Sequence, residues 1–192
     1  MNLALRERVS PISLNGRNDR NCAYEFDGVR PIAVAGGTRA HAAIQRNLAI
    51  SIGGRLINKP CQFFGSDLKT LTSEDHSRYP DGIVTCSGGE KTSTSVSDPT
   101  VIFEILNPST ASYDRIVKAP EYMAMPSVRQ YIMLEQDRVG ALVLTRLDGA
   151  WKPEFLKADS TLAMPEIGVE LPLAELYRGI SFSLEETTEQ SE

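Results

Sequence analysis

The chain has 192 residues, 41% of them hydrophobic and 23% charged, which is enough to bury the core of one compact domain. Its 20 basic and 25 acidic residues give a net charge of −5 without a Lys/Arg cluster, which argues against tight non-specific binding to DNA. No apolar run is long enough for a signal peptide or a membrane span, so we expect a cytoplasmic protein.

The sequence contains three widely spaced cysteines: Cys22, Cys61 and Cys86. Because they form no Cys-x-x-Cys pair, we expect reduced thiols rather than a disulfide framework or a zinc site. Residues 24–182 are predicted to form one domain. The extension before it (1–23) is poorly patterned, which favours disorder, and the segment after it (183–192) reads as an acidic, solvated tail.

In chain order, the first predicted element is a strand pair in residues 24–35, folded around a turn at Asp27 and Gly28. A helix should follow Thr38, because apolar residues recur there at four-residue intervals and give the helix one face to pack against a sheet. Those residues are Ile44, Leu48, Ile52 and Leu56.

Strands are predicted next at residues 61–64, 67–71, 82–86 and 101–106. A helix then begins near Ser109 and Thr110 and runs toward Tyr122. The remaining elements are an antiparallel meander at 130–135, 141–146 and 151–156, and a short closing helix at 173–178. Asp148 and Gly149 form a strong hairpin signal between the last two strands.

A single acidic residue, Glu104, interrupts the apolar run from Val101 to Leu106. That run is rich in β-branched residues and lies between two prolines, which is typical of a buried strand. Burying an uncompensated carboxylate is costly, so we expect Glu104 to be paired, protonated or bound to a metal. The alternative is an edge strand on which Glu104 faces solvent.

A second acid, Asp81, opens the preceding strand, and the Ser-, Thr- and Gly-rich stretch 87–98 fits a loop between adjacent antiparallel strands. This pairing would bring Asp81 and Glu104 together. Two converging carboxylates repel each other unless a cation lies between them, and such hard ligands suit Mg²⁺ or Mn²⁺. The alternative is that Pro80-Asp81-Gly82 is an ordinary turn.

The helix that follows the strand carries Lys118, which we expect to reach back to the two acids. There an ammonium group can orient a metal-bound water or offset charge that develops on a phosphate. The alternative is a solvated surface lysine. Pro120, two residues later, would kink the predicted helix and could shift Lys118.

Ordered matches to one known family extend from Tyr24 to Phe182, in residues 24–28, 35–41, 64–69, 79–81, 103–110, 113–115 with Lys118, 126–131 and 168–177. On these stretches the chain resembles the Uma-type restriction endonuclease family of the PD-(D/E)xK nuclease superfamily. The resemblance implies an α/β (α+β), restriction-endonuclease-like fold with a mixed β-sheet flanked by helices, and a metal-dependent phosphodiesterase site.

Carried over by position, the resemblance implies that Asp81 and Glu104 bind the metal, and that Lys118 replaces the motif lysine expected two residues after the acid. We expect the carbonyl of Ile105 to be a further metal ligand. Glu25 and His41 match positions at the rim of the site, as auxiliary ligands or positioning groups. The alternative for His41 is a helix cap or a packed surface group.

Our first hypothesis is therefore a Mg²⁺- or Mn²⁺-dependent endonuclease that hydrolyses phosphodiester bonds in DNA, a weakly bound substrate. The second is a catalytically impaired binding or assembly module that keeps the nuclease fold, motivated by Pro120, Asn107 and the acidic surface. The third is a hydrolase of another phosphoester.

Two further expectations concern the surface. Five basic residues could line a phosphate-facing groove, although we expect each of them to be solvated: Arg39, Arg46, Arg55, Lys69 and Arg78. The segment from Tyr122 to Met125 looks exposed and, together with apolar edge strands, motivates the prediction of a homodimer.

Overall fold

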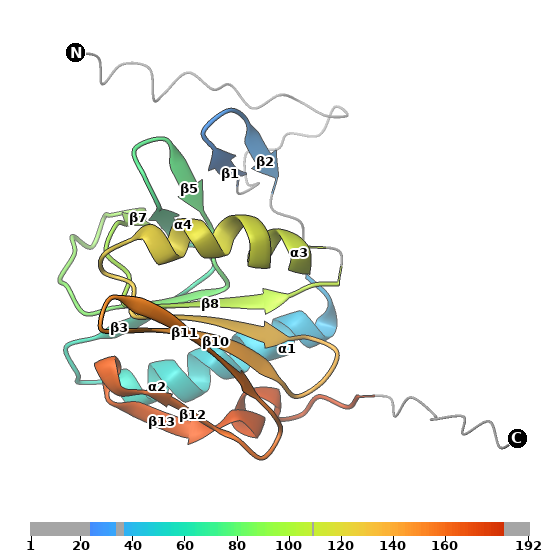
Figure 1. The fold of residues 1–192 in the computed structure, drawn as a ribbon. Helices are drawn as coiled ribbons and strands as arrows, with labels where there is room; N and C mark the ends of the chain where they lie inside the picture. The colour runs from blue at the N-terminus through green and yellow to red at the C-terminus, as the bar shows by residue number, and fades with distance from the viewer. Residues whose placement is uncertain (1–23, 34–36, 109, 183–192) are drawn as a thin grey trace, which may run out of the picture.

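The computed structural model describes residues 24–33, 37–108 and 110–182. The predicted extension and acidic tail lie outside these residues, as does Cys22. A six-stranded mixed sheet forms the centre of the fold (Figure 1). Its strands, in spatial order, are β11 (Ala150–Leu156), β10 (Ala141–Leu147), β9 (Gln130–Glu135), β8 (Val101–Leu106), β6 (Gly82–Thr85) and β3 (Gln62–Gly65).

One face of this sheet is covered by the first helical segment, seen in cyan in Figure 1. It consists of α1 (Arg39–Leu48), a π-helical turn η2 (Ala49–Gly53) and the short α2 (Gly54–Leu56). Thr38 caps α1 by accepting a hydrogen bond from the His41 N–H at 3.1 Å. The predicted apolar face is confirmed, because all four of its residues are buried in the core beneath the sheet: Ile44, Leu48, Ile52 and Leu56.

The opposite face of the sheet is covered by a second helical segment, seen in yellow in Figure 1. It runs through α3 (Ala111–Tyr113), a π-helical turn η3 (Asp114–Lys118) and α4 (Ala119–Ala124). Side chains of β8 alternate between the two cores: Val101, Phe103 and Ile105 face the α1 side, whereas Ile102 and Leu106 face the α4 side. Glu104 therefore points toward the helix that carries Lys118.

β8 is an interior strand, antiparallel to β6 and parallel to β9. The edge-strand alternative for Glu104 is therefore wrong. The predicted meander is confirmed, since β10 pairs antiparallel with both β9 and β11. Asp148 and Gly149 turn the β10–β11 hairpin with φ values of 49° and 83°. Positive φ at both central residues is the geometry that an Asp-Gly turn provides.

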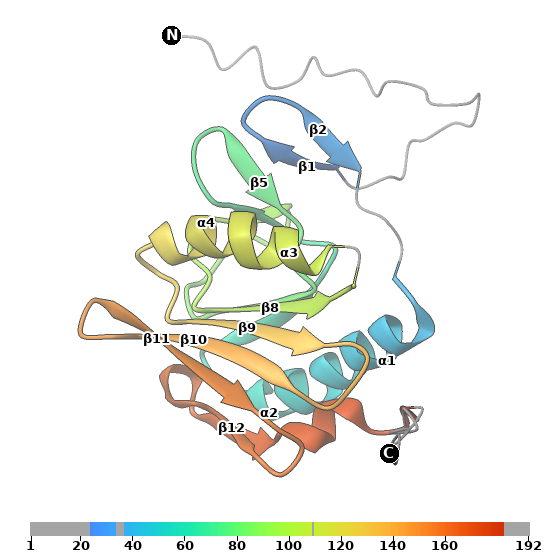
Figure 2. The same ribbon diagram turned by 45° about the vertical axis from the view of Figure 1, so that its right-hand side comes forward.

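A smaller five-stranded sheet lies beyond α3 and α4, as Figure 2 shows for β1, β2 and β5. Its strands, in spatial order, are β2 (Pro31–Ala33), β1 (Tyr24–Asp27), β5 (His76–Arg78), β4 (Lys69–Leu71) and β7 (Ser95–Val96). Pairing of β1 with β2 confirms the predicted N-terminal hairpin over its described residues. The predicted strand at 67–71 contributes β4 to this sheet rather than to the central one.

The last part of the described chain packs beside α2 (Figure 1). It contains β12 (Thr161–Met164), a 3₁₀ turn η4 (Pro165–Ile167), β13 (Val169–Pro172) and a second 3₁₀ segment η5 (Leu173–Tyr177). η5 is the predicted closing helix, and Leu173, Leu176 and Tyr177 are buried in the core under the sheet. Among the described residues, no helix is both long and apolar enough to cross a membrane.

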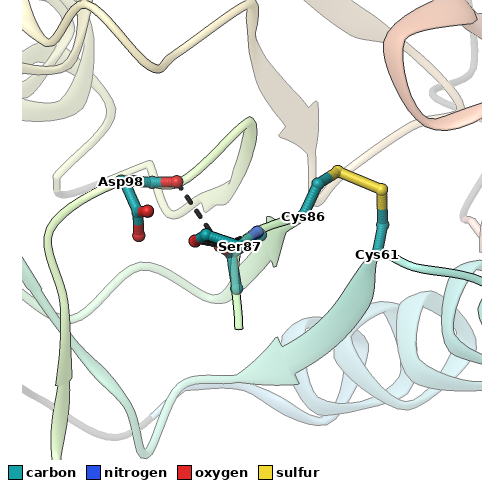
Figure 3. The surroundings of a disulfide bond; sticks show 5 residues. Cys61, Cys86, Ser87 and Asp98 are labelled. Carbon is teal, nitrogen blue, oxygen red and sulfur yellow. Dashed lines mark hydrogen bonds between the residues drawn. A yellow bond between two sulfur atoms is a disulfide. The ribbon is translucent and has the colours of Figure 1, made fainter. Parts of the chain in front are cut away.

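The expectation of reduced cysteines is wrong for Cys61 and Cys86, which form a disulfide at the start of β3 and the end of β6 (Figure 3). Gln62 pairs with Thr85, so the two cysteines occupy the next opposed positions of an antiparallel ladder. Their spacing in the sequence gives no sign of this, because it does not show which strands are neighbours.

Two surface expectations are also wrong. Tyr122 and Met125 are buried against the sheet, so the segment 122–125 does not form an exposed apolar patch. Arg78, expected to be solvated, is fully buried. All three side chains face inward because α4 lies between the central sheet and the small sheet, and this interface is not visible in the sequence.

Candidate active site

The two acids predicted to converge do so at the end of the β6–β8 ladder. Gly82 pairs with Phe103, which places Asp81 opposite Glu104 at the next position. Asp81 Oδ2 accepts a hydrogen bond of 2.7 Å from the backbone N–H of Ile105. Its other oxygen, Oδ1, lies 3.2 Å from His41 Nε2. Asp81 is thus more than a turn residue, because its carboxylate is tied to two other elements.

Glu104 is held inside the protein, with only 4% of its surface exposed. Its Oε1 accepts hydrogen bonds from Lys118 Nζ at 3.0 Å and from the Tyr122 hydroxyl at 3.1 Å. Burial raises the pKa of Glu104 to about 8; Lys118 opposes this rise, and the charges of Asp81 and Asp114 add to it. Burial therefore disfavours the ionised form of Glu104, and a further cation beside it would stabilise that form.

Lys118 lies within ion-pair distance of three carboxylates. Its Nζ lies 3.0 Å from Glu104 Oε1, 3.2 Å from Glu25 Oε1 and 3.2 Å from Asp114 Oδ1. Burial alone would lower the pKa of Lys118, but the charges of these carboxylates outweigh it and raise the pKa above its ordinary value. Lys118 is therefore a buried ammonium group, and the surface alternative is wrong.

Pro120 does not displace Lys118, because the helix widens just before the proline. In the π-helical turn η3, the N–H of Ala119 donates to the carbonyl of Asp114, one residue further back than in an α-helix. Pro120 follows directly after this wide turn, at the beginning of α4. Lys118 still donates a hydrogen bond to Glu104, so the proline does not move it out of the site.

Asp114 and Tyr122 also lie in the site, although neither was predicted from the sequence. Burial raises the pKa of Asp114, whose Oδ2 also accepts a hydrogen bond from the Thr110 hydroxyl. Burial and the charge of Glu104 raise the pKa of Tyr122, so its hydroxyl stays protonated and donates to Glu104. The signal that could have found them is spacing, because residues 114, 118 and 122 recur every four positions on one helical face.

The two rim residues are also brought to the site, from separate elements. Glu25, on β1, accepts from the Tyr79 N–H at 3.1 Å and lies against Lys118. His41, in the first turn of α1, approaches Asp81 as described above. Its ring packs so closely on Gly37 that a Cβ there would lie 2.6 Å from His41 Cγ, so a side chain at residue 37 would displace the His41 ring.

These residues line a cavity of about 570 Å³ together with Arg30, Ile105 and Tyr113. Lys118 is the buried cation of this cavity. Four carboxylates also line it: Glu25, Asp81, Glu104 and Asp114. In the described part of the chain, no three His, Cys, Asp or Glu side chains are grouped to hold an ion by themselves. The oxygen donors that line the cavity are of the chemical type that Mg²⁺ or Mn²⁺ takes, because Mg²⁺ is commonly bound by one or two carboxylates and keeps several waters.

Known proteins resemble this chain in sequence and in fold. Residues 13–174 match the Uma2 family model, whose description is "Putative restriction endonuclease". The uncharacterized protein slr1290 of Synechocystis sp. is 30% identical over 160 residues, covering 82% of this chain and 84% of that protein. The uncharacterized protein sll1609 of the same organism is 28% identical over 116 residues, covering 58% and 66%.

A crystal structure described as a "putative nuclease belonging to DUF820" from Anabaena variabilis superposes with a TM-score of 0.68. It shares 18% sequence identity, and the match covers 81% of this chain and 89% of the other. The architecture is thus a restriction-endonuclease-like α+β fold, as predicted. The chain belongs to the Uma2 family of restriction endonuclease-like proteins, which confirms the family indicated by its motifs.

Proposed function

We propose that this protein is a metal-dependent endonuclease of the PD-(D/E)xK type that hydrolyses phosphodiester bonds in DNA. The observation that carries the proposal is the meeting of Asp81, Glu104 and Lys118 at the base of one cavity. Family membership and the fold of the Anabaena protein support it. The net charge of −5 is consistent with weak binding of DNA by the rest of the protein surface.

In this proposal Asp81 and Glu104 hold Mg²⁺ or Mn²⁺, with the carbonyl of Ile105 as a further ligand. The bound ion supplies Lewis acidity, which polarises a phosphate oxygen and lowers the pKa of a coordinated water. Lys118 and Tyr122 both bind Oε1 of Glu104, so we assign Oε2 to the metal.

The surrounding residues orient this machinery. The Ile105 N–H and His41 each contact one oxygen of Asp81. The carboxylate is therefore already oriented before the reaction, and no free energy is spent on orienting it. Lys118 remains charged, and the proposal gives it the role of orienting the attacking water and offsetting charge that develops on the phosphate. Arg30, on the cavity wall, is available to a neighbouring phosphate of the DNA.

Cleavage of supercoiled plasmid and of single-stranded DNA tests the proposal, with Mg²⁺, Mn²⁺ or EDTA in parallel. Asp81→Asn and Glu104→Gln should abolish metal-dependent cleavage and retain the folded state by circular dichroism. Glu154→Gln, an exposed position on β11, is the matched control and should cut like wild type. Undiminished cleavage by Glu104→Gln would contradict the assignment.

The second hypothesis, a binding or assembly module, was partly motivated by Pro120, and the structure removes that support. Pro120 leaves Lys118 in contact with Glu104 and so does not argue for a dead site. The predicted homodimer likewise loses the exposed segment 122–125 on which it partly depended. Both remain predictions that the metal and DNA experiments, and a measured molecular mass, decide.

A further inference from the structure

Arg78 is the largest side chain that the described fold buries completely. It lies on β5 of the small sheet and binds Glu121 of α4 through two bonds, Nε to Oε2 at 2.8 Å and Nη2 to Oε1 at 2.6 Å. A buried ion pair of this kind seldom adds net stability over apolar packing, because both groups must be desolvated. Such a pair can instead orient the two elements that it joins.

Arg78 also contacts a residue of the candidate site. Phe26 pairs with Ser77, so Glu25 and Arg78 occupy the next opposed positions of the β1–β5 ladder. Arg78 Nη1 lies 3.8 Å from Glu25 Oε2, and the other oxygen of Glu25, Oε1, lies 3.2 Å from Lys118 Nζ. Glu25 is thus held between the arginine and the lysine.

On the helix side, Glu121 follows Lys118 by three residues, so the two side chains are neighbours, and each contacts a residue of the small sheet. Glu25 of the small sheet pairs with Lys118 of the helical segment, and Arg78 of the small sheet pairs with Glu121. Each charge meets its opposite, which fixes the register of the two elements. A shift of the small sheet along the helix would separate both pairs together.

We propose that Arg78 and Glu121 are positioning residues that lock the small sheet onto α4 and thereby hold Glu25 against Lys118. They act on the reaction only through Glu25 and Lys118, and their effect on cleavage rests on the proposed function. The packing part of the proposal stands on contacts within the chain and is measured separately.

The test compares Lys118 acetylation in the full chain by mass spectrometry, with the exposed Lys152 and Lys157 as internal references. The variant Arg78→Met/Glu121→Met removes both charges and keeps side chains of similar length. Lys118 labelling should rise several-fold relative to the references. For metal-dependent plasmid cleavage, kcat should fall about tenfold or more while KM for DNA stays unchanged.

Arg146→Met is the matched control. Arg146 also anchors α4, through hydrogen bonds to the carbonyls of Met123 and Met125, but it makes no link to Glu25. This variant should lower the melting temperature and leave Lys118 labelling and kcat as in wild type. If any loss of an α4 anchor has the same effect, Lys118 labelling, kcat and the melting temperature will change in both variants. That result would overturn the proposal.

Unchanged Lys118 labelling in a folded Arg78→Met/Glu121→Met variant would also overturn it. Should this variant not melt cooperatively, Arg78→Lys replaces it, because lysine keeps the charge but cannot form two parallel bonds to Glu121. The same rise in labelling is expected there, and its absence counts equally against the proposal. If wild type cuts no DNA, the proposed function fails, whereas the labelling comparison still decides the positioning role.

Discussion

The Cys61–Cys86 disulfide provides a quantitative prediction, because its effect on stability follows from the loop that it closes. The two cysteines are separated by 25 positions. In the chain-entropy model, closing such a loop in the unfolded chain contributes about 3.5 kcal/mol to the free energy of unfolding at 25 °C. For a protein of this size, that contribution corresponds to roughly 10 °C in melting temperature.

The assay is thermal unfolding with and without dithiothreitol, together with the Cys61→Ser/Cys86→Ser variant. Reduction and substitution should lower the melting temperature by similar amounts, and dithiothreitol should have no effect on the variant. Cys22→Ser is the control and should retain the full response to dithiothreitol. A melting temperature that stays constant after mass spectrometry confirms reduction would refute the reasoning, as would three free thiols in protein purified without reductant.

Three further predictions concern the site, the core and the pH dependence. Lys118→Met should abolish cleavage but raise Mn²⁺ affinity by about tenfold, because it removes a cation from three carboxylates; calorimetry giving unchanged or weaker affinity would contradict this. Phe103→Ala should reduce the free energy of unfolding by about 3–5 kcal/mol in urea titrations, since Phe103 is fully buried on the central strand, and a loss below about 1 kcal/mol would count against this packing. The hydrogen bond from Arg55 lowers the pKa of Glu175 in the folded protein. This bond should therefore stabilise the fold fully above the ordinary pKa of a glutamate, and its contribution should be lost as the pH falls through the lowered pKa. The difference in urea midpoint between wild type and Glu175→Gln should therefore shrink between about pH 5 and pH 3, and a constant difference would exclude this linkage.

The central strand and the meeting of its acid with Asp81 were predictable from the sequence because the information is local. An apolar run between prolines indicates a buried strand, and a short polar connection indicates that its predecessor is an antiparallel neighbour. Asp81 and Glu104 then face each other by register alone. The meander was predictable for the same reason, from its Asp148-Gly149 turn.

Contacts between elements distant in the sequence were not predictable in this way. Arg78 was expected at the surface because a charged side chain is normally solvated, and its partner Glu121 lies on another element 43 positions away. The Cys61–Cys86 bridge likewise depends on the order of strands in the sheet. Tyr122 was expected at the surface, whereas its burial follows from the docking of α4 against the sheet.

Titration of Mn²⁺ into the protein by calorimetry tests most directly the claim that Asp81 and Glu104 form the metal site on which the proposed hydrolysis depends. Wild type and the exposed-site control Glu154→Gln should bind Mn²⁺ alike, and Asp81→Asn and Glu104→Gln should each lose most of the affinity while keeping the wild-type circular dichroism spectrum. Equal Mn²⁺ affinity in all four proteins would contradict the account.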